Sequence, residues 1–268
     1  MKLPLKAFCG LAIAMGACGV NAEVYVNKSI VSVNYDMNVG KTMEENAAKY
    51  DRFWLGYVNA TTASWGEFVA VVELDDYFLS GENDDHAKGK DSFSTVRTVF
   101  DAHLNIGEEK GLNVWLQNFN IAQPTIIENE MFVGVSYDLE LGGFTIRPRA
   151  AVQYYNLIHM KPYEAVNGDG SSQFSGFNGY IAGVDISKRF EMKLPLSFTF
   201  IGDYFGGYDN EYLTKSLSMD DYSYNLNLVV NAHVTKNFTV AIEATKKYNM
   251  SGFGENGEFL TFSMRYAF

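Results

Sequence analysis

The final nine residues, Leu260-Thr-Phe-Ser-Met-Arg-Tyr-Ala-Phe268, alternate strictly between two kinds of side chain. Large apolar side chains hold the even positions, and threonine, serine, arginine and alanine hold the odd ones. Successive side chains of a β-strand point to opposite faces, so this pattern predicts a strand with one apolar and one polar face. The rest of the chain must supply the strands that pair with it.

This stretch has further features that matter because it ends the sequence. Its apolar face is unbroken, Arg265 stands amid the polar face, and the last residue is Phe268. The combination resembles the C-terminal assembly signal of outer-membrane β-barrels. We therefore expect the barrel-assembly machinery to be a partner, through the strand that ends at Phe268.

The first 22 residues have the composition of a secretory signal peptide. Lys2 and Lys6 precede an apolar run, and small residues lead up to Glu23. Both cysteines of the chain lie in this segment, so the cleaved chain has no disulfide and no thiolate metal ligand. We expect a signal peptide over residues 1–22 and one domain over 23–268.

The composition excludes several classes of protein. Without Lys2 and Lys6 the 21 basic residues fall to 19, against 32 acidic ones, which is the wrong balance for nucleic-acid binding. No later apolar run is long enough for a membrane-spanning helix, which takes about 20 residues. Aromatic residues make up 15% of the chain and it has 24 glycines, which favours strands and turns.

Alternation of period two marks twelve segments of the chain. Each reaches roughly the 9 to 11 residues that a tilted strand needs to cross a membrane. They are 31–40, 51–63, 66–78, 93–106, 111–120, 130–141, 143–158, 177–189, 194–206, 222–235, 237–248 and 258–268. An even number of strands places both ends of the chain on the periplasmic side.

Long and short connections alternate between these segments. The long ones are 41–50, 79–92, 121–129, 159–176, 207–221 and 248–257, and the short ones lie near 64–65, 107–110, 142, 190–193 and 236. This rhythm is typical of outer-membrane barrels, whose closed sheet pairs every backbone polar group inside lipid. We predict an all-β fold: a transmembrane antiparallel up-and-down β-barrel of about 12 strands, located in the outer membrane amid its lipid and lipopolysaccharide.

The apolar face of each strand is assigned to lipid, so the opposite face lines the barrel. Inward positions hold five of the six arginines, namely Arg97, Arg147, Arg149, Arg189 and Arg265. They also hold acidic residues, namely Asp36, Glu73, Asp75, Asp101, Asp138, Asp185, Asp203 and Glu243. One interpretation is a salt-bridge ladder that stiffens the wall. The other is a selectivity lining, because we expect that nearest neighbours cannot neutralise both Arg147 and Arg149.

Aromatic side chains share the inward positions, and a flat ring beside polar groups suits a nucleobase or a sugar ring. The alternative is that they fill a small lumen. The residues we expect to line the pore and contact a small-molecule solute are Asp75, Tyr77, Arg97, Asp101, Trp115, Phe132, Arg147, Arg149, Tyr155 and Arg265.

Catalytic and metal-binding motifs are missing from the sequence. It has no glycine-rich phosphate loop and no paired-histidine metal motif, and His103 is expected to make a structural hydrogen bond. We expect no enzyme activity, no cofactor and no metal. Acidic residues of the outer loops form solvated tips or bind divalent cations that bridge lipopolysaccharide: Glu82, Asp84, Asp85, Asp91, Asp209, Glu211, Asp220 and Asp221.

Three stretches carry a resemblance to a known family: FVAVVELDDYFLSGENDDHAKGKDSF at 68–93, FNGYIAGVDISKRF at 177–190 and LSFTFIGDYFGGYDNEY at 196–212. The chain resembles the nucleoside-specific channel-forming outer-membrane proteins, the Tsx and OmpK group. The resemblance implies passive uptake of nucleosides through a narrow channel lined by aromatic and ionisable residues. The residues alone leave two alternatives open: a narrow porin for acidic sugars or other anions, and a plugged structural or adhesion barrel that acts through its outer loops.

Overall fold

The computed structural model describes residues 23–42, 51–75, 95–107, 111–123, 126–159, 173–215, 220–250 and 253–268. No helix in these ranges is long and apolar enough to cross a membrane. Several predictions fall outside the described residues: the signal peptide, Tyr77, Glu82, Asp84, Asp85 and Asp91.

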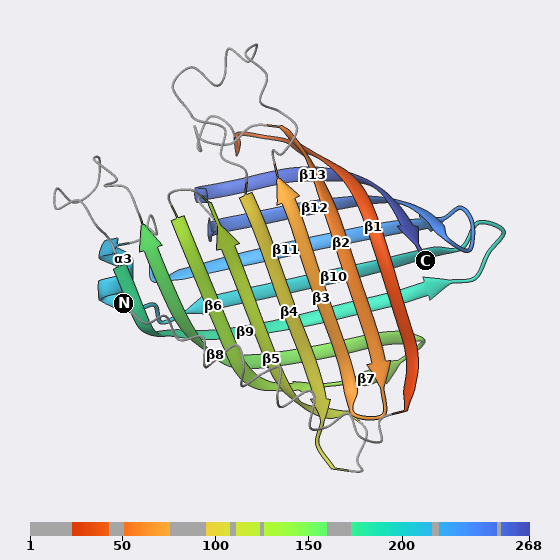
Figure 1. Cartoon of the computed structure of the whole chain (residues 1–268), viewed down its shortest axis with the longest axis horizontal. Helices are drawn as coiled ribbons and strands as arrows, with labels where there is room; N and C mark the ends of the chain where they lie inside the picture. The colour runs from red at the N-terminus through yellow and green to blue at the C-terminus, as the bar shows by residue number, and fades with distance from the viewer. Residues whose placement is uncertain are drawn as a thin grey trace.

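The described chain is almost entirely β-structure (Figure 1). The elements are β1 (Val24–Asn38), β2 (Arg52–Ala63), β3 (Gly66–Asp75), β4 (Thr95–Asn105), β5 (Leu112–Ala122), β6 (Ile126–Tyr137), β7 (Leu139–Leu141), β8 (Phe144–His159), β9 (Gln173–Phe190), β10 (Leu196–Gly206), α3 (Asn210–Lys215), β11 (Tyr222–His233), β12 (Phe238–Met250) and β13 (Phe253–Ala267).

The strands form one closed antiparallel sheet. Strands that follow one another in sequence pair, except that β6 pairs with β8 and not with β7, and β1 pairs with β13. The three-residue β7 continues β6 beyond Asp138 and pairs with β8, as β6 does. β6 and β7 therefore count as one strand of the wall, and the thirteen strands form a twelve-stranded barrel. The predicted barrel is therefore confirmed, including the pairing of the C-terminal strand with the first one.

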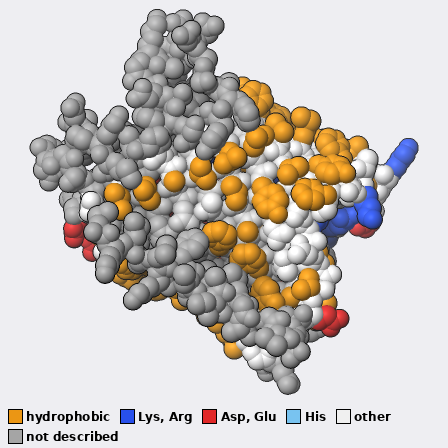
Figure 2. Space-filling model, in the orientation of Figure 1, with side chains coloured by type: hydrophobic (Ala, Val, Ile, Leu, Met, Phe, Trp, Pro, Cys, Tyr) orange, Lys and Arg blue, Asp and Glu red, His pale blue; other side chains and the backbone are white. Residues whose placement is uncertain are grey.

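The two faces of the wall follow the predicted alternation. On β8, Val152 and Tyr154 are exposed, whereas Gln153 and Tyr155 are buried inside the barrel. The same even positions on β11 place Leu226, Leu228 and Val230 outside. Much of the visible barrel surface is accordingly apolar (Figure 2), as contact with lipid requires.

The two ends of the barrel differ. The start of β1 and the end of β13 lie at one end of the barrel, together with tight connections such as 64–65 and 142–143, and we call it the turn end. We call the opposite end, where β2 begins and β3 ends, the loop end. Two predicted long loops are wrong. Strand β5 continues to Ala122, and β6 begins at Ile126. Likewise, β12 continues to Met250, and β13 begins at Phe253. Strand pairing continues into these stretches, so only short connections remain.

A belt of aromatic rings encircles part of the outer face near the loop end. Tyr180, Tyr204, Tyr222, Tyr248 and Tyr224 stack in that order, with ring centroids 5.3 to 6.5 Å apart. Tyrosine favours the level where hydrocarbon meets headgroups, because its ring is apolar and its hydroxyl polar. We call these five residues the tyrosine belt, and it fixes the depth of this end in the membrane.

Candidate functional site

The lumen has two chemically different walls. Charged side chains on β1 to β4 form an ionic wall, and aromatic side chains on β5, β6, β8, β9 and β10 form an aromatic wall. Both arise from the same inward parity, because strand register places paired residues on one face. The functional candidates are therefore the residues that these walls bring together.

The ionic wall is built around two arginines that share one carboxylate. Arg52 contacts Asp36 at 3.1 Å and Asp75 at 2.9 Å. Arg97 contacts the same Asp75 and lies 3.7 Å from Glu73. Asp75 is fully buried, and a buried carboxylate persists only when charge and hydrogen bonds compensate it. The wall is thus a continuous ion-pair network across four strands.

A second arginine contact crosses the lumen. The Nε of Arg147 on β8 donates to Asp138, and its Nη2 lies 2.7 Å from Oε2 of Glu67 on β3. Four strand spacings of about 4.8 Å separate β3 from β8 along the wall, roughly 19 Å. Side chains reach each other over that span only through the interior. We call the Arg147–Glu67 pair the crossbar, and it narrows the lumen toward the turn end.

Arg149, two residues further along β8, lies against the wall. It contacts Asp185 and, at 2.6 Å, Asp203. Gly183 lies on β9, where it pairs with Arg149 on β8 and with Asp203 on β10, and a Cβ there would stand 2.2 Å from the Asp203 carboxylate. The arginine therefore reaches Asp203 because residue 183 has no side chain.

Trp115 connects the charged and aromatic regions. Its indole Nε1 donates to Asp101 at 2.7 Å, and the guanidinium carbon of Arg149 lies 5.1 Å from the ring centroid. The ring of Phe132 stacks beside it at 6.2 Å with planes 7° apart. A cation over an aromatic face is attracted by the ring quadrupole, which fixes the orientation of both groups.

The aromatic wall is tightly packed. Trp115, Phe132 and Phe205 form one buried cluster with Ala151 and Ile181. A second cluster toward the loop end contains Tyr155, Leu157, Phe174 and Tyr212. In this arrangement these rings fill part of the lumen, which agrees with the alternative interpretation of the inward aromatics.

Tyr208 joins the two clusters. It lies between β10 and α3, is half-buried, and packs against both groups of rings. Its hydroxyl is hydrogen-bonded to Ser223. Burial, together with the neighbouring Tyr212, holds the pKa of the Tyr208 phenol well above its ordinary value, so the hydroxyl stays neutral. Among the residues that pack against the two clusters, Tyr208 is the aromatic one that is only partly buried.

The structure assembles most of the predicted set but not all of it. Asp75 and Arg97 meet in the ionic wall, while Asp101, Trp115, Phe132 and Arg149 meet beside the aromatic wall. Arg147 forms the crossbar, and Tyr155 lies in the second aromatic cluster. Arg265 stands apart and donates to Asn231 at 2.9 Å. Arg189 pairs with Glu191 at the turn end, where it is largely exposed.

Sequence reasoning missed four residues that the structure places in the lumen. Arg52, Glu67 and Lys247 have inward parity, and that parity could have identified them. Lys247 lies within electrostatic range of Arg97 and Glu73 on the facing strands. Tyr208 had no such signal, because it lies outside the alternating segments.

Nearest neighbours were not expected to neutralise both Arg147 and Arg149, and the structure pairs both arginines with carboxylates. Each contacts two carboxylates, and the missing partner of Arg147 is Glu67 from across the lumen rather than a nearest neighbour. Arg52 and Arg97 likewise contact two acidic residues each. Four arginines thus meet seven different carboxylates, which leaves this described part of the lumen with an excess of negative charge.

His103, a further ionisable group of inward parity, has a structural partner. His103 forms a 2.7 Å hydrogen bond with Ser136, the kind of role expected for it. In the described ranges, no group of three or more His, Cys, Asp or Glu residues is arranged to hold a metal ion. The arrangement offers carboxylate acceptors, fixed cations and aromatic faces, which suit binding of a flat, hydroxylated solute.

Comparison with solved structures supports the architecture. The NanC porin superimposes with a TM-score of 0.52 at 12% identity, covering 89% of this chain and 98% of that one. The KdgM porin (TM-score 0.47, 9% identity, 89% and 99% covered) and LpxR from Salmonella typhimurium (0.48, 10%, 89% and 99%) are more distant. At such identities only the fold is shared, and NanC alone carries that point. No curated protein sequence matches the chain.

The family relationship is clearer at the level of sequence. A family model described as nucleoside-specific channel-forming protein, Tsx, matches residues 33–267. The match reaches all twelve strands of the barrel wall, so the resemblance suggested by the three quoted stretches is confirmed. The chain belongs to the nucleoside-specific channel-forming protein family, Tsx, and is a channel of the outer membrane.

Proposed function

We propose that this channel carries nucleosides by passive diffusion, without catalysis, along the boundary between the two walls. The observation that supports this most is Tyr208, a partly buried phenol packed against both aromatic clusters, in a barrel whose ionic wall carries carboxylates held by Arg52 and Arg97. A nucleobase offers a π-face for stacking, worth about 1 to 3 kcal/mol per base at an aromatic residue. Ribose hydroxyls donate well to carboxylates, since hydrogen bonds to charged groups are the stronger ones.

The charge balance supports a neutral solute over an acidic one. All four paired arginines are already engaged by carboxylates, and the acidic groups outnumber them. An acidic sugar would meet repulsion from this excess, whereas an uncharged nucleoside would not. We therefore favour nucleosides over the anion porin.

A planar bilayer experiment tests this proposal. Adenosine added to one side should block the single-channel current transiently, and an acidic disaccharide should not. Tyr208→Ala should weaken adenosine block about fivefold or more, the low end of the stacking range. Tyr137→Ala, on the exposed outer face, serves as a control and should leave block unchanged.

Each result separates the alternatives. Block by the disaccharide in place of adenosine would favour the anion porin. A well-folded barrel without any conductance would favour a plugged barrel that acts through its outer loops. Adenosine block that is equal in both variants would remove Tyr208 from the binding path.

The interactions with the membrane and its assembly machinery are part of the same proposal. The apolar outer face would contact lipid and lipopolysaccharide, and β13, ending at Phe268, would be the strand recognised during insertion. Phe268 is exposed, while its backbone N–H pairs with Ser29 at 3.0 Å. Its side chain is thus free to be recognised after its backbone is fixed in the sheet.

A further inference from the structure

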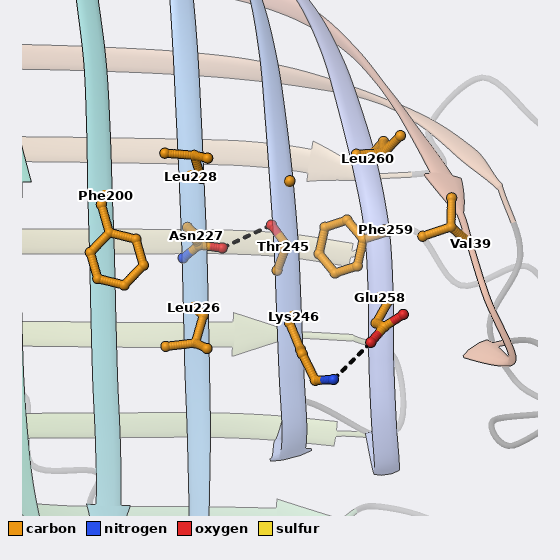
Figure 3. A pocket seen from close by; sticks show the side chains of 11 residues that line it. Val39, Phe200, Leu226, Asn227, Leu228, Thr245, Lys246, Glu258, Phe259 and Leu260 are labelled. Carbon is orange, nitrogen blue, oxygen red and sulfur yellow. Dashed lines mark hydrogen bonds and ion pairs between the residues drawn. The ribbon is translucent and has the colours of Figure 1, made fainter.

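A lysine without an acidic partner stands on the lipid-facing surface near the turn end. On the outward parity of the strands, the side chains that the structure describes include three charged ones: Lys188, Lys246 and Glu258. Lys246 on β12 and Glu258 on β13 neutralise each other near the loop end, with Nζ and a carboxylate oxygen 2.8 Å apart (Figure 3). Lys188 on β9 forms no such pair within the described ranges. Charge that faces lipid is unfavourable, so the ammonium of Lys188 needs a counter-charge from outside the chain.

Two phenylalanine rings hold this ammonium, and a third ring packs against both. The Nζ of Lys188 lies 4.1 Å from the ring centroid of Phe144 and 5.5 Å from that of Phe190. Phe198 on β10 is the cross-strand partner of Lys188, and its ring centroid lies 5.9 Å from that of Phe144 and 6.3 Å from that of Phe190. A cation is attracted to an aromatic face, so these rings fix the position of the ammonium. We call Phe144, Phe190 and Phe198 the phenylalanine cradle.

The backbone of the neighbouring turn fixes the ammonium further. Lys188 donates a hydrogen bond to the carbonyl oxygen of Gly142 at 3.0 Å. A Cβ at Gly143 would lie 3.8 Å from both Cε and Nζ of Lys188, so the end of the lysine side chain lies against this turn. An ammonium has three N–H donors, and this contact uses one of them. In the described part of the chain, two donors are thus left for an acceptor outside the protein.

The position of the cradle identifies the leaflet that it meets. Phe144 begins β8 and Phe190 ends β9, so the cradle lies at the turn end of the wall. The short turns of outer-membrane barrels face the periplasm. The leaflet on that side consists of glycerophospholipids, whereas lipopolysaccharide occupies the opposite leaflet, at the loop end. A lysine at this level keeps its four-carbon stem on the apolar surface and places its ammonium among the lipid phosphates.

We propose that Lys188 and the phenylalanine cradle bind the headgroup of an anionic glycerophospholipid in the periplasmic leaflet. The lipid phosphate accepts hydrogen bonds from the ammonium of Lys188 and supplies the counter-charge that the described chain lacks. The bound lipid fixes the depth of the turn end in the membrane, as the tyrosine belt does for the loop end. The site lies on the outer face, so it does not depend on which solute the lumen carries.

The charges of the neighbouring turns favour an anionic headgroup over a zwitterionic one. Glu140 lies on the inward parity and accepts a hydrogen bond from Thr145 at 2.7 Å. Glu191 is paired with Arg189. The acids that the structure describes in these two turns are thus engaged elsewhere, and neither is paired with Lys188. Phosphatidylglycerol has a phosphate without a cation, whereas the ammonium of phosphatidylethanolamine would be repelled by Lys188, so we expect the site to prefer phosphatidylglycerol.

Native mass spectrometry of the refolded barrel tests the site. The full barrel is released from micelles that contain phosphatidylglycerol and phosphatidylethanolamine in equal amounts, and the retained lipids of each kind are counted. The wild type should retain more phosphatidylglycerol. Lys188→Gln should lower this preference about fivefold, the effect expected of one lysine near an anionic lipid surface. Lys188→Arg keeps a cation beside the rings and should retain the preference.

Lys236→Gln is the matched control, because Lys236 is an exposed lysine in the connection between β11 and β12 at the same end of the barrel. It should keep the wild-type preference, and heat-modifiable gel mobility confirms folding of all the variants. Equal retention of the two lipids by the wild type would overturn the proposal, and so would a preference that survives Lys188→Gln. An equal loss in Lys236→Gln would overturn it too, because any positive charge at the turn end would then have the same effect.

Discussion

The crossbar makes Glu67→Gln an informative substitution, because it separates conduction from stability. The Glu67 side chain is 40% exposed, so its ion pair with Arg147 is screened by water and contributes at most about 1 kcal/mol to folding. Arg147 keeps its contact with Asp138 and is not left as an isolated charge. The barrel should therefore fold normally while the ion pair across its lumen is reduced to a weaker hydrogen bond.

The effect on ion selectivity follows from Coulomb's law. A passing monovalent ion about 5 Å from Glu67, in water with a dielectric constant near 80, interacts with that charge by roughly 0.8 kcal/mol. Removing the charge should lower the permeability of cations by about fourfold and raise that of anions by about as much, since RT is about 0.6 kcal/mol, so the cation-to-anion ratio should fall roughly 16-fold. Single-channel conductance should rise, because Arg147 is held less firmly across the lumen.

The assay is reversal potential and single-channel current of the refolded protein in a planar bilayer under a salt gradient. Glu191→Gln is a matched control, because Glu191 is a more exposed acid that pairs with Arg189 at the turn end. The control should retain wild-type conductance, with a smaller shift in selectivity. Higher salt should reduce both effects, since the Debye length is about 10 Å at 0.1 M.

One result would refute this reasoning. If Glu67→Gln folds and conducts with unchanged current and unchanged reversal potential, ions do not pass the crossbar. The conduction path would then avoid the space between β3 and β8, and the narrowing of the lumen would have to be assigned to other residues.

Three further predictions concern packing, processing and assembly. Gly183→Ala should lower the free energy of unfolding by about 1 to 3 kcal/mol in urea titrations in micelles, because its Cβ would overlap the Asp203 carboxylate, whereas Gly176→Ala, with its nearest contact at 3.4 Å, should cost less. Mass spectrometry of the exported protein should find Glu23 as the first residue; a retained leader would contradict the signal-peptide hypothesis. Deleting Phe268 should slow formation of the heat-modifiable barrel in cells without preventing refolding in micelles, and an equal defect in both would indicate lost stability instead.

The fold was largely predictable because every strand of a barrel alternates with the same period of two residues, one side chain pointing outward and the next inward. Alternation assigned the apolar face of each strand to lipid and the opposite face to the interior, and on β8 the exposed Val152 and the buried Gln153 agree with it. The ends of strands were less predictable. Polar residues near 121–129 and 248–257 indicated loops, but pairing between adjacent strands carries β-structure through most of those stretches. Outside the membrane, polar residues occur both in strands and in loops, so their polarity could not distinguish a strand from a loop.

The site was predictable in its composition and not in its contacts. Parity gave the inward position of Arg147, but its Glu67 partner depends on barrel curvature and on strand tilt, which bring β8 and β3 together across the interior. Tyr208 belongs to a connection without period, and only the folded position of that connection places it against the aromatic wall. Long-range contact is a property of the closed sheet and not of any one strand.

The ion pairs of the lumen connect the strands of the wall, and they also hold in fixed positions the charged groups that a solute would meet. Asp75 is held by Arg52 and Arg97 together, so neither arginine can turn freely toward an anion in transit. Fixing such groups in advance spares a passing solute the cost of reorganising them, which is how preorganised polar groups favour one ligand over another. A neutral nucleoside then meets acceptors that are already in place. An anion meets four arginines that already contact carboxylates, so on this proposal the paired part of the lumen favours neutral solutes over negative ones.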